Sequence, residues 1–551
     1  MSLQPQTIPP VPELTASTAH AAFPRGNRYL AMRDELGVFY SDQEFAPLFP
    51  TRGQPAQTPW RLALIVVFQF AEGLSDVQAA DAVRSRIDWK YALSLDLDDP
   101  GFDSSVLSEF RTRLIHGHME LHLLDAMLAR FKECGLLKAR GRQRTDSTHV
   151  LAAVRALNRL TGVGETMRHA LNTLARVLPS WVATQLDPAW RERYGTRFDD
   201  YRLPKTEADG QALAEQIGAD GRRLLTALAA ADTPAWLWEV PAVRTLWQVW
   251  MQQYYAVPAS DPMRWRVWAD VPPAAQMINT PYDVEARYSV KRTTTWTGYT
   301  VHMTETCDDD LPHLITHVET TPATTPDWHA AALIHPALAA KDLLPSEHLL
   351  DAGYVDTDTL VTSQADYQIA VIGPVPPDNS WQARANTGFD IGCFSIDWDA
   401  KRMTCPQGQV SCKWSETHDR HGSPIINIRF ARRDCQACPR HDQCTTSAGA
   451  REMTIRPQQI HTALHAARRY QRTEDFKQRY RARAGIEGTL SESLRMGDLR
   501  HARYVGEAKT RLQHLLTAAG MNLRRLGAWY TETPRARTRT APFVALMQTS
   551  P

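Results

Sequence analysis

Apolar and polar residues follow helical spacing over much of the chain, with a region of alternating pattern in between. Residues 58–76 and 103–114 carry apolar side chains at helical spacing near capping residues, which indicates a bundle of helices over residues 26–135. Residues 151–268 repeat Ala, Leu and Arg at helical spacing and predict a second helical block. Residues 459–530 predict a long final helical region.

The alternating region predicts strands. Residues 295–307 and 313–321 are rich in β-branched residues and read as an antiparallel pair joined by the acidic turn DDDLP. EHLLDAGYV predicts a short strand, DTDTLVTSQ a helix and YQIAVIGPV another strand. With GRQRTDSTHV as a first strand, the order is strand, hairpin, strand, helix, strand and helix. That order is typical of an RNase H-like α/β domain.

A chain of 551 residues is too long for one ordinary core. We therefore expect a multidomain, mainly α protein with an α/β RNase H-like catalytic core, an N-terminal helical bundle, a helical insertion and a Cys-rich insertion. The expected parts are a disordered tail (1–25), a helical DNA-binding or dimerisation domain (26–135), the catalytic core (136–150, 269–380 and 455–530), the helical insertion (151–268), the Cys-rich insertion (381–454) and a second disordered tail (531–551).

Charge is distributed unevenly. The formal net charge is only +1, yet residues 468–525 hold fourteen Lys and Arg against six Asp and Glu. Such a local surplus is typical of a surface that binds a polyanion, and the alternative is a solvated helix face. The longest apolar run, LALIVVFQFA, is too short to span a membrane, and the first residues lack a signal-peptide pattern. We expect a cytoplasmic protein with no membrane partner.

Cysteines cluster in one segment. Six of the eight lie between Cys393 and Cys444, which favours metal binding over a disulfide framework in a large reduced protein. The CPQG and CQACP turns are knuckle-like, and four thiolates can bind Zn²⁺ tetrahedrally. The alternative is a metal-free Cys-rich β module. The spacing is Cys405-x6-Cys412 followed by Cys435-x2-Cys438-x5-Cys444.

Asp146 lies between the basic approach GRQRT and an apolar pattern that begins at Val150. On these residues alone a helix cap is favoured, because Asp and Ser accept hydrogen bonds from the free amides of a first turn. If GRQRTDSTHV is instead a strand, Asp146 lies on it or at its end, and Asp351 ends a central strand. Two such carboxylates can share divalent metal ions about 3.5–4 Å apart, as in phosphoryl transfer. Mg²⁺ suits a site of few carboxylates plus substrate phosphate.

A third carboxylate is expected from the final helical region. Tyr480, Arg483 and Glu487 lie at i, i+3 and i+7 and therefore share one face of a helix. An Arg one turn from the Glu can bind a phosphate or orient the acid. The alternative is an ordinary Arg–Glu helix pair, worth only a few tenths of a kcal/mol. The acidic turn DDDLP is a weaker candidate, because Asp is favoured in turns anyway.

Together these motifs resemble the DDE transposases of bacterial insertion sequences. The resemblance rests on Asp146 in TDSTHV, Asp351 in LLDAGYV and Glu487 in YRARAGIEGTLSESLR, and it extends over most of residues 45–530. Tyr-x2-Arg-x3-Glu matches the signature around the third acid in one large group of these enzymes. A Lys often follows that Glu there, whereas this chain has Leu494 and then Arg495.

The resemblance implies a DNA transposase in which Asp146, Asp351 and Glu487 hold Mg²⁺ or Mn²⁺. It would cleave transposon ends and transfer the 3′-hydroxyls into target DNA. The resemblance also implies a homodimer in the synaptic complex. The alternatives are a structure-specific nuclease on the same fold and a catalytically inactive DNA-binding derivative.

The resemblance also implies roles for further residues. A similar Cys-Pro pattern in related transposases favours Cys405, Cys435, Cys438 and Cys444 as zinc ligands, with Cys412 spare and His441 able to replace one. The residues expected to hold DNA are Tyr480, Arg483, Arg495, and Arg111 and Arg113, which lie off the apolar face of their predicted helix.

Overall fold

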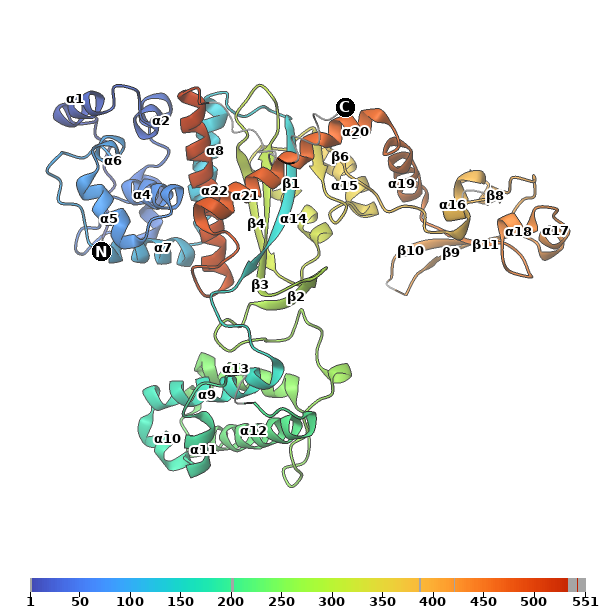
Figure 1. Cartoon of the computed structure of the whole chain (residues 1–551), viewed down its shortest axis with the longest axis horizontal. Coiled ribbons are helices and arrows are strands. Elements are labelled where there is room, and N and C mark those ends of the chain that lie inside the picture. The colour runs from blue at the N-terminus through green and yellow to red at the C-terminus, as the bar shows by residue number, and fades with distance from the viewer. Residues whose placement is uncertain (1, 200–202, 386–387, 421, 534–542, 544–551) are drawn as a thin grey trace.

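A six-stranded mixed sheet lies at the centre of the molecule (Figure 1). The computed structural model describes residues 2–199, 203–385, 388–420, 422–533 and 543. The strands are β1 (Arg142–Leu151), β2 (Arg287–Lys291), β3 (Thr294–Thr306), β4 (Ile315–Pro322), β5 (Glu347–Leu350) and β6 (Ala370–Ile372), and the helices between them are α14 (Asp327–Ala340) and α15 (Thr357–Tyr367).

The strand order positions the ends of β1 and β5 side by side. The sheet runs β2-β3-β1-β5-β6, with β4 paired to β3. β1 is antiparallel to β3 and parallel to β5, and β5 is parallel to β6. The sequence prediction of a hairpin followed by two further strands is confirmed, and the topology is compatible with an RNase H-like core.

The N-terminal helices pack directly on the central domain. α22 (Glu507–Tyr530) contacts both α4 (Pro59–Glu72) and β4, and one continuous hydrophobic core extends from Tyr29 to Leu526. The bundle is therefore not a separate globule. Its helices are α1 (Glu13–Ala22), α2 (Arg28–Leu36), α3 (Asp42–Phe45), η1 (Ala46–Leu48), α4 (Pro59–Glu72), α5 (Asp76–Ser85), α6 (Ile87–Ala92), α7 (Ser105–His116) and α8 (His122–Glu133).

The expectation of disorder over residues 1–25 is wrong for part of that range, because α1 is a helix. Ala19 is buried in a small cluster with Leu30 and Tyr91. The Thr15 hydroxyl donates a hydrogen bond of 2.8 Å to the carbonyl of Leu95. Composition suggested a solvated tail, whereas these tertiary contacts hold the segment as a helix. In the second predicted tail, 531–551, residues 534–542 and 544–551 lie outside the described residues.

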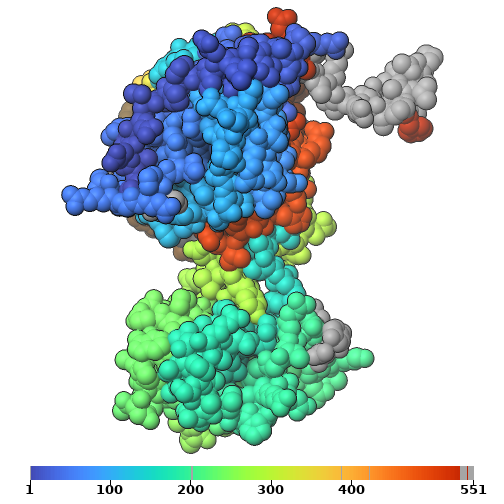
Figure 2. Space-filling model, turned by 90° about the vertical axis from the view of Figure 1, so that its left-hand side faces the viewer, coloured from blue at the N-terminus to red at the C-terminus, as the bar shows by residue number. Residues whose placement is uncertain are grey.

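The helical insertion follows β1 and forms a lobe of its own, joined to the rest by a narrow neck (Figure 2). Its core is a separate cluster that includes Leu160, Leu224 and Trp250. Its helices are α9 (Arg159–Val177), α10 (Pro179–Gln185), α11 (Pro188–Tyr194), α12 (Glu207–Leu228), η3 (Ala235–Glu239), α13 (Pro241–Gln253) and η4 (Trp268–Asp270).

The boundary before this insertion differs from the expected one. The apolar pattern from Val150 suggested a helix there, but β1 continues to Leu151 and α9 begins only at Arg159, capped by Asn158. Pairing with β3 along the whole of β1 outweighs the local helical pattern. Asp146 is therefore a strand residue, and the helix-cap interpretation is wrong.

The Cys-rich segment forms a small β module with its own core around Met403, Ile428 and Phe430. It extends away from the central sheet (Figure 1). Its elements are α16 (Trp381–Ala385), η5 (Ile391–Cys393), β7 (Ser395–Asp397), β8 (Arg402–Thr404), β9 (Lys413–His418), β10 (Pro424–Arg429), α17 (Arg432–Gln436), α18 (His441–Cys444) and β11 (Glu452–Ile455).

The final helices return the chain to the sheet. They are α19 (Gln458–Tyr470), α20 (Glu474–Tyr480), η6 (Arg481–Ala484), α21 (Gly485–Gly497) and α22 (Glu507–Tyr530). The expected single helical face for Tyr480, Arg483 and Glu487 is interrupted, since the 3₁₀ turn η6 separates α20 from α21.

No single helix among the described residues is both long enough and apolar enough to cross a membrane. Within the described residues, α4 and α5 taken together have the length and composition of a membrane span, but they are bent by 110° at the break between them.

Gly298 allows β1 and β3 to approach closely. A Cβ at this position would lie 2.1 Å from the Val150 carbonyl oxygen and 2.6 Å from the Ala152 nitrogen. Gly298→Ala should therefore cost about 1–3 kcal/mol, as overpacking typically does. Gly488→Ala is the matched control, because no atom lies within 4 Å of its Cβ and Ala is the better helix former. Urea unfolding of both variants tests this, and an unchanged midpoint for Gly298→Ala would contradict the close packing.

Candidate active site

Three acidic side chains come from three separate elements and meet at one edge of the sheet. Asp146 lies on β1, Asp351 directly follows β5, and Glu487 lies in the first turn of α21. Thr145 pairs with Leu350 in the parallel β1–β5 ladder, so the next residues, Asp146 and Asp351, are neighbours in register.

The guanidinium of Arg483 lies between the three carboxylates. Its Nη2 is 2.7 Å from Asp146 Oδ2 and 3.9 Å from Asp351 Oδ2, and its Nη1 is 3.2 Å from Glu487 Oε1. Because the two aspartates contact the same nitrogen at 2.7 and 3.9 Å, their oxygens lie at most 6.6 Å apart. Residues separated by more than 300 positions therefore surround a single cation.

Burial differs among the three acids. The exposed fraction of the side chain is 15% for Asp146, 45% for Asp351 and 68% for Glu487. Burial raises the pKa of Asp146 above its ordinary value, although the Arg483 charge and the hydrogen bond from the Ser147 amide both act to lower it. Asp351 accepts a hydrogen bond of 2.7 Å from the Ala352 amide, which fixes its first oxygen.

The chemistry of the three acids fits a divalent cation. Carboxylate oxygens are the ligands that Mg²⁺ takes in proteins. All three carboxylates already contact one positive group, the Arg483 guanidinium. In the part of the chain that is described, no three His, Cys, Asp or Glu side chains are arranged to hold a metal ion. Arg483 occupies the space between the acids, so it must move before a metal ion can bind there.

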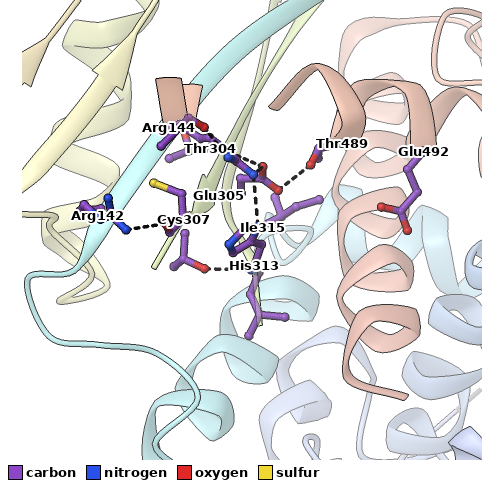
Figure 3. A network of polar contacts seen from close by, with 12 residues as sticks. Arg142, Arg144, Thr304, Glu305, Cys307, His313, Ile315, Thr489 and Glu492 are labelled. Carbon is purple, nitrogen blue, oxygen red and sulfur yellow. Dashed lines mark hydrogen bonds and ion pairs between the residues drawn. The ribbon is translucent and has the colours of Figure 1, made fainter. Parts of the chain in front are cut away.

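A buried network fixes the third acid's helix against the sheet (Figure 3). The carboxylate of Glu305 on β3 is fully buried and accepts hydrogen bonds from Arg144 on β1, Thr489 on α21 and Arg525 on α22, at 2.7, 2.6 and 2.7 Å. We call these four residues the Glu305 clamp. Burial acts to raise the pKa of Glu305, but the charges of Arg525 and Arg144 hold it below its usual range.

The Glu305 clamp also reaches the turn that carries Arg483. Arg144 Nη1 donates a hydrogen bond of 2.5 Å to the carbonyl of Ala482. Gly485 leaves space for this contact, since a Cβ there would lie 2.1 Å from Arg144 Nη1. Arg144 lies two residues before Asp146 on β1. The clamp therefore fixes the positions of η6 and α21 relative to this part of β1.

Sequence reasoning missed the Glu305 clamp, although a signal was present. Arg144 and Glu305 are opposite charges on two predicted strands, and the structure pairs them directly in the β1–β3 register. Opposite charges inside strands that are otherwise apolar or rich in Thr indicate a buried pair. The register needed to match them was not available from the sequence.

A second polar group missed by sequence reasoning flanks Asp146. Asp327, at the start of α14, accepts hydrogen bonds from the Ser147 hydroxyl at 3.1 Å and from Lys291 Nζ at 2.9 Å. The Lys291 side chain is 60% exposed, and its charge also acts to lower the pKa of Asp146. Lys291 therefore supplies positive charge beside the acids. In α21, the position where related transposases often carry a lysine is occupied by Leu494.

The predicted DNA-contacting residues divide into two groups. Tyr480 stacks on Phe476, with ring centroids 5.3 Å apart, and Arg495 is exposed on α21. Arg111 and Arg113, which were expected to hold DNA, already have partners within the bundle. Arg111 is buried and pairs with Asp76 at 2.6 Å, while Arg113 pairs with Glu109 at 2.6 Å and donates to the Leu48 carbonyl. Both tie helices of the bundle together.

The predicted zinc ligands line one cavity in the Cys-rich module. The cavity has a volume of about 30 Å³, which is enough to hold a water molecule. Its lining includes Cys405, Cys435, Cys438, Cys444 and His441. The His441 Nε2 atom is buried and has no hydrogen-bond partner among the described residues, as a metal-ligating nitrogen would require. Cys412 lies elsewhere, and its thiol contacts the Arg429 carbonyl.

Comparison with known families gives two matches. Residues 404–527 match the family model "Transposase DDE domain", and residues 17–113 match the model "Transposase domain (DUF772)". The matches support a DDE transposase. The first includes Glu487, Arg483 and the zinc-ligand candidates, whereas Asp146 and Asp351 lie outside both matched segments. No curated protein and no solved structure matches the chain.

Glu305→Gln tests the clamp through the pH dependence of stability. The folded pKa of Glu305 is lowered, so its stabilisation is fully present above the unfolded pKa of about 4.3 and is lost as the pH falls through the folded value. At pH 7 the variant should lose about 3–5 kcal/mol, because the buried Arg144 guanidinium loses its ion-pair partner and Arg525 keeps only Glu492. The difference from wild type in thermal unfolding midpoint should narrow below about pH 4. A difference independent of pH would contradict the ionised clamp.

Proposed function

We propose that the protein is a DNA transposase that cleaves transposon ends and joins the freed 3′-hydroxyls to target DNA. The observation that carries this proposal is the convergence of Asp146, Asp351 and Glu487 around one cation position. The two transposase family matches support the same function. We propose DNA as the substrate, a homodimer in the synaptic complex and a cytoplasmic location.

The proposed reaction is two successive phosphoryl transfers. In the first, a water oxygen forms a bond to phosphorus and the P–O3′ bond breaks, leaving a 3′-hydroxyl. In the second, that hydroxyl attacks a target phosphodiester and displaces its 3′-oxygen. Asp146, Asp351 and Glu487 would hold Mg²⁺ or Mn²⁺. Divalent ions bound by such acids activate the attacking oxygen and stabilise the leaving one.

Positive side chains around the acids would position the DNA. The Arg483 Nε atom is buried without a hydrogen-bond partner among the described residues, and movement of this side chain toward DNA would let it donate to a phosphate oxygen. Lys291 and Arg495 are exposed and can contact the backbone on either side of the acids. Such contacts bind phosphate without reading sequence.

The alternatives differ in their products. A structure-specific nuclease would stop after the first transfer, and an inactive derivative would bind DNA without cutting it. End-labelled element DNA, incubated with the protein, Mg²⁺ and a supercoiled target, separates the three. Strand-joined products support the transposase, cleaved ends alone support the nuclease, and intact ends support the inactive derivative.

Asp146→Asn, Asp351→Asn and Glu487→Gln should each abolish cleavage while binding of end DNA persists. Each change removes a negative ligand and keeps the side-chain shape, so the loss reflects chemistry rather than folding. A denaturing gel measures cleavage, and a mobility shift measures binding. Glu492→Gln is the control, because this acid lies on the same helix but pairs with Arg525 at 2.8 Å. Cleavage by any of the three variants at the rate of the control would contradict the assignment.

We also propose that Cys405, Cys435, Cys438 and Cys444 bind one structural Zn²⁺, with His441 able to replace one thiolate. Elemental analysis of purified protein should find about one zinc per chain, and Cys435→Ser should lose it. Cys412→Ser should retain zinc, because this thiol lies outside the cavity. A chelator should lower the thermal stability of wild type, since structural zinc contributes folding free energy. Zinc-free wild-type protein would refute the proposal.

A further inference from the structure

A second cleft lies well outside the acidic site. It has a volume of about 430 Å³, within the range of about 300–1,000 Å³ typical of ligand pockets. It is formed where α19 meets β11 and α16, at the base of the Cys-rich module. We call it the α19 cleft. Among its lining residues, those that carry the argument are Trp381, Arg451, Arg456, His461, His465 and Arg468.

Flat aromatic surfaces line one part of the α19 cleft. His461 and His465 lie one helical turn apart on α19, with ring centroids 4.2 Å apart and an interplanar angle of 33°. Burial lowers the pKa of His461 to about 4 and that of His465 below its usual value, so both rings are neutral at pH 7. The indole of Trp381 is 38% exposed. These rings offer uncharged faces for stacking.

Positive charge lines another part. Arg451 donates a hydrogen bond of 2.8 Å to the Cys444 carbonyl, yet its Nε atom is buried without a partner in the described structure. Arg456 forms an ion pair of 3.4 Å with Asp419 and donates to the Pro424 carbonyl at 3.4 Å. Arg468 donates to the Pro376 carbonyl. Arg456 and Arg468 therefore keep donors that can reach an anion, and the Arg451 guanidinium adds positive charge to the lining.

Two acids also line the cleft and offset part of this charge. Glu452 already pairs with Arg429 at 3.0 Å, and its side chain is 65% exposed. Asp378 accepts a hydrogen bond of 2.9 Å from the Ser380 amide. Three guanidiniums line the cleft together with these two carboxylates, and this surplus of positive charge favours an anionic ligand. The aromatic rings favour a ligand that also carries a flat ring.

We propose that the α19 cleft binds unpaired nucleotides of DNA, with bases stacked on Trp381 and the imidazoles and phosphates held by the arginines. Aromatic faces combined with a basic groove are the common design for single-stranded nucleic acid. Duplex DNA fits less well, because its base faces are covered by neighbouring bases. This inference deepens the proposed function, since cleavage at a transposon end exposes unpaired strands.

The cleft is linked to the acidic site through the chain. α19 carries Arg468 and continues through α20 and η6 to Arg483. α19 also packs against α15, the helix that follows Asp351. A strand bound in the cleft therefore engages the same run of helices that presents the third acid.

The test is fluorescence anisotropy of full-length protein with a fluorescein-labelled 15-nucleotide oligo(dT). Trp381→Ala should weaken binding about five- to 150-fold, the range for loss of one stacked base. Trp236→Ala is the matched control, since this indole is 50% exposed on the helical insertion, and it should bind as wild type does. Unchanged affinity for Trp381→Ala, or equal losses in both variants, would overturn the inference.

A second variant separates charge from stacking and from misfolding. Arg456→Gln alters a partly exposed residue with weak internal contacts and should reduce the log–log salt slope for oligo(dT) by about 0.7. An unchanged slope would count against the phosphate contact. Competition with free dTMP distinguishes the source of the nucleotide. Displacement of the oligonucleotide by equimolar dTMP would show a mononucleotide site and overturn the DNA assignment.

Failure of this inference is distinguishable from failure of the proposed function. Asp146→Asn should lose cleavage and keep wild-type affinity for oligo(dT). Cleavage by wild type together with unaltered oligo(dT) binding by Trp381→Ala would refute the cleft alone. Absence of cleavage together with weakened binding by Trp381→Ala would refute the transposase and leave the cleft supported.

Discussion

The arrangement of the acidic site depends on one buried carboxylate. Glu305 has no exposed side-chain surface, and an ion in such a place is costly unless it is paired and hydrogen-bonded. Arg144 and Arg525 supply the charge, and Thr489 supplies a further donor. Because these partners belong to β1, α22 and α21, satisfying Glu305 also brings the last helices against the sheet. The position of Glu487 relative to Asp146 follows from that requirement.

This dependence explains how the site tolerates long interruptions. The helical lobe follows β1 and the Cys-rich module precedes α19, yet each has its own hydrophobic core. The core of the central domain is instead continuous with the N-terminal bundle, through α22. Insertions that fold independently leave the sheet edge intact, while α22 and the Glu305 clamp maintain its contact with α21.

Local sequence patterns predicted the strands, and the resemblance to DDE transposases selected the three acids, but neither predicted the contacts between distant elements. β3, β4 and β5 carried clear alternating or apolar patterns, and Asp351 followed from the end of β5. The helix predicted to begin at Val150 is wrong, because pairing of β1 with β3 outweighs the local helical pattern. The DNA contact predicted for Arg111 rested on its polar helical face. That face is covered by α5, through the ion pair of Arg111 with Asp76. The role of Arg483 between three acids required a fold that local patterns do not encode.

The central claim is that Asp146, Asp351 and Glu487 form one cation site in which Arg483 and a catalytic metal ion exclude each other. Anomalous diffraction from crystals grown with Mn²⁺ tests it most directly. We expect an anomalous peak bounded by the carboxylates of Asp146 and Asp351, with the Arg483 guanidinium moved away from the acids. A peak elsewhere, with the Arg483 ion pairs intact, would contradict it.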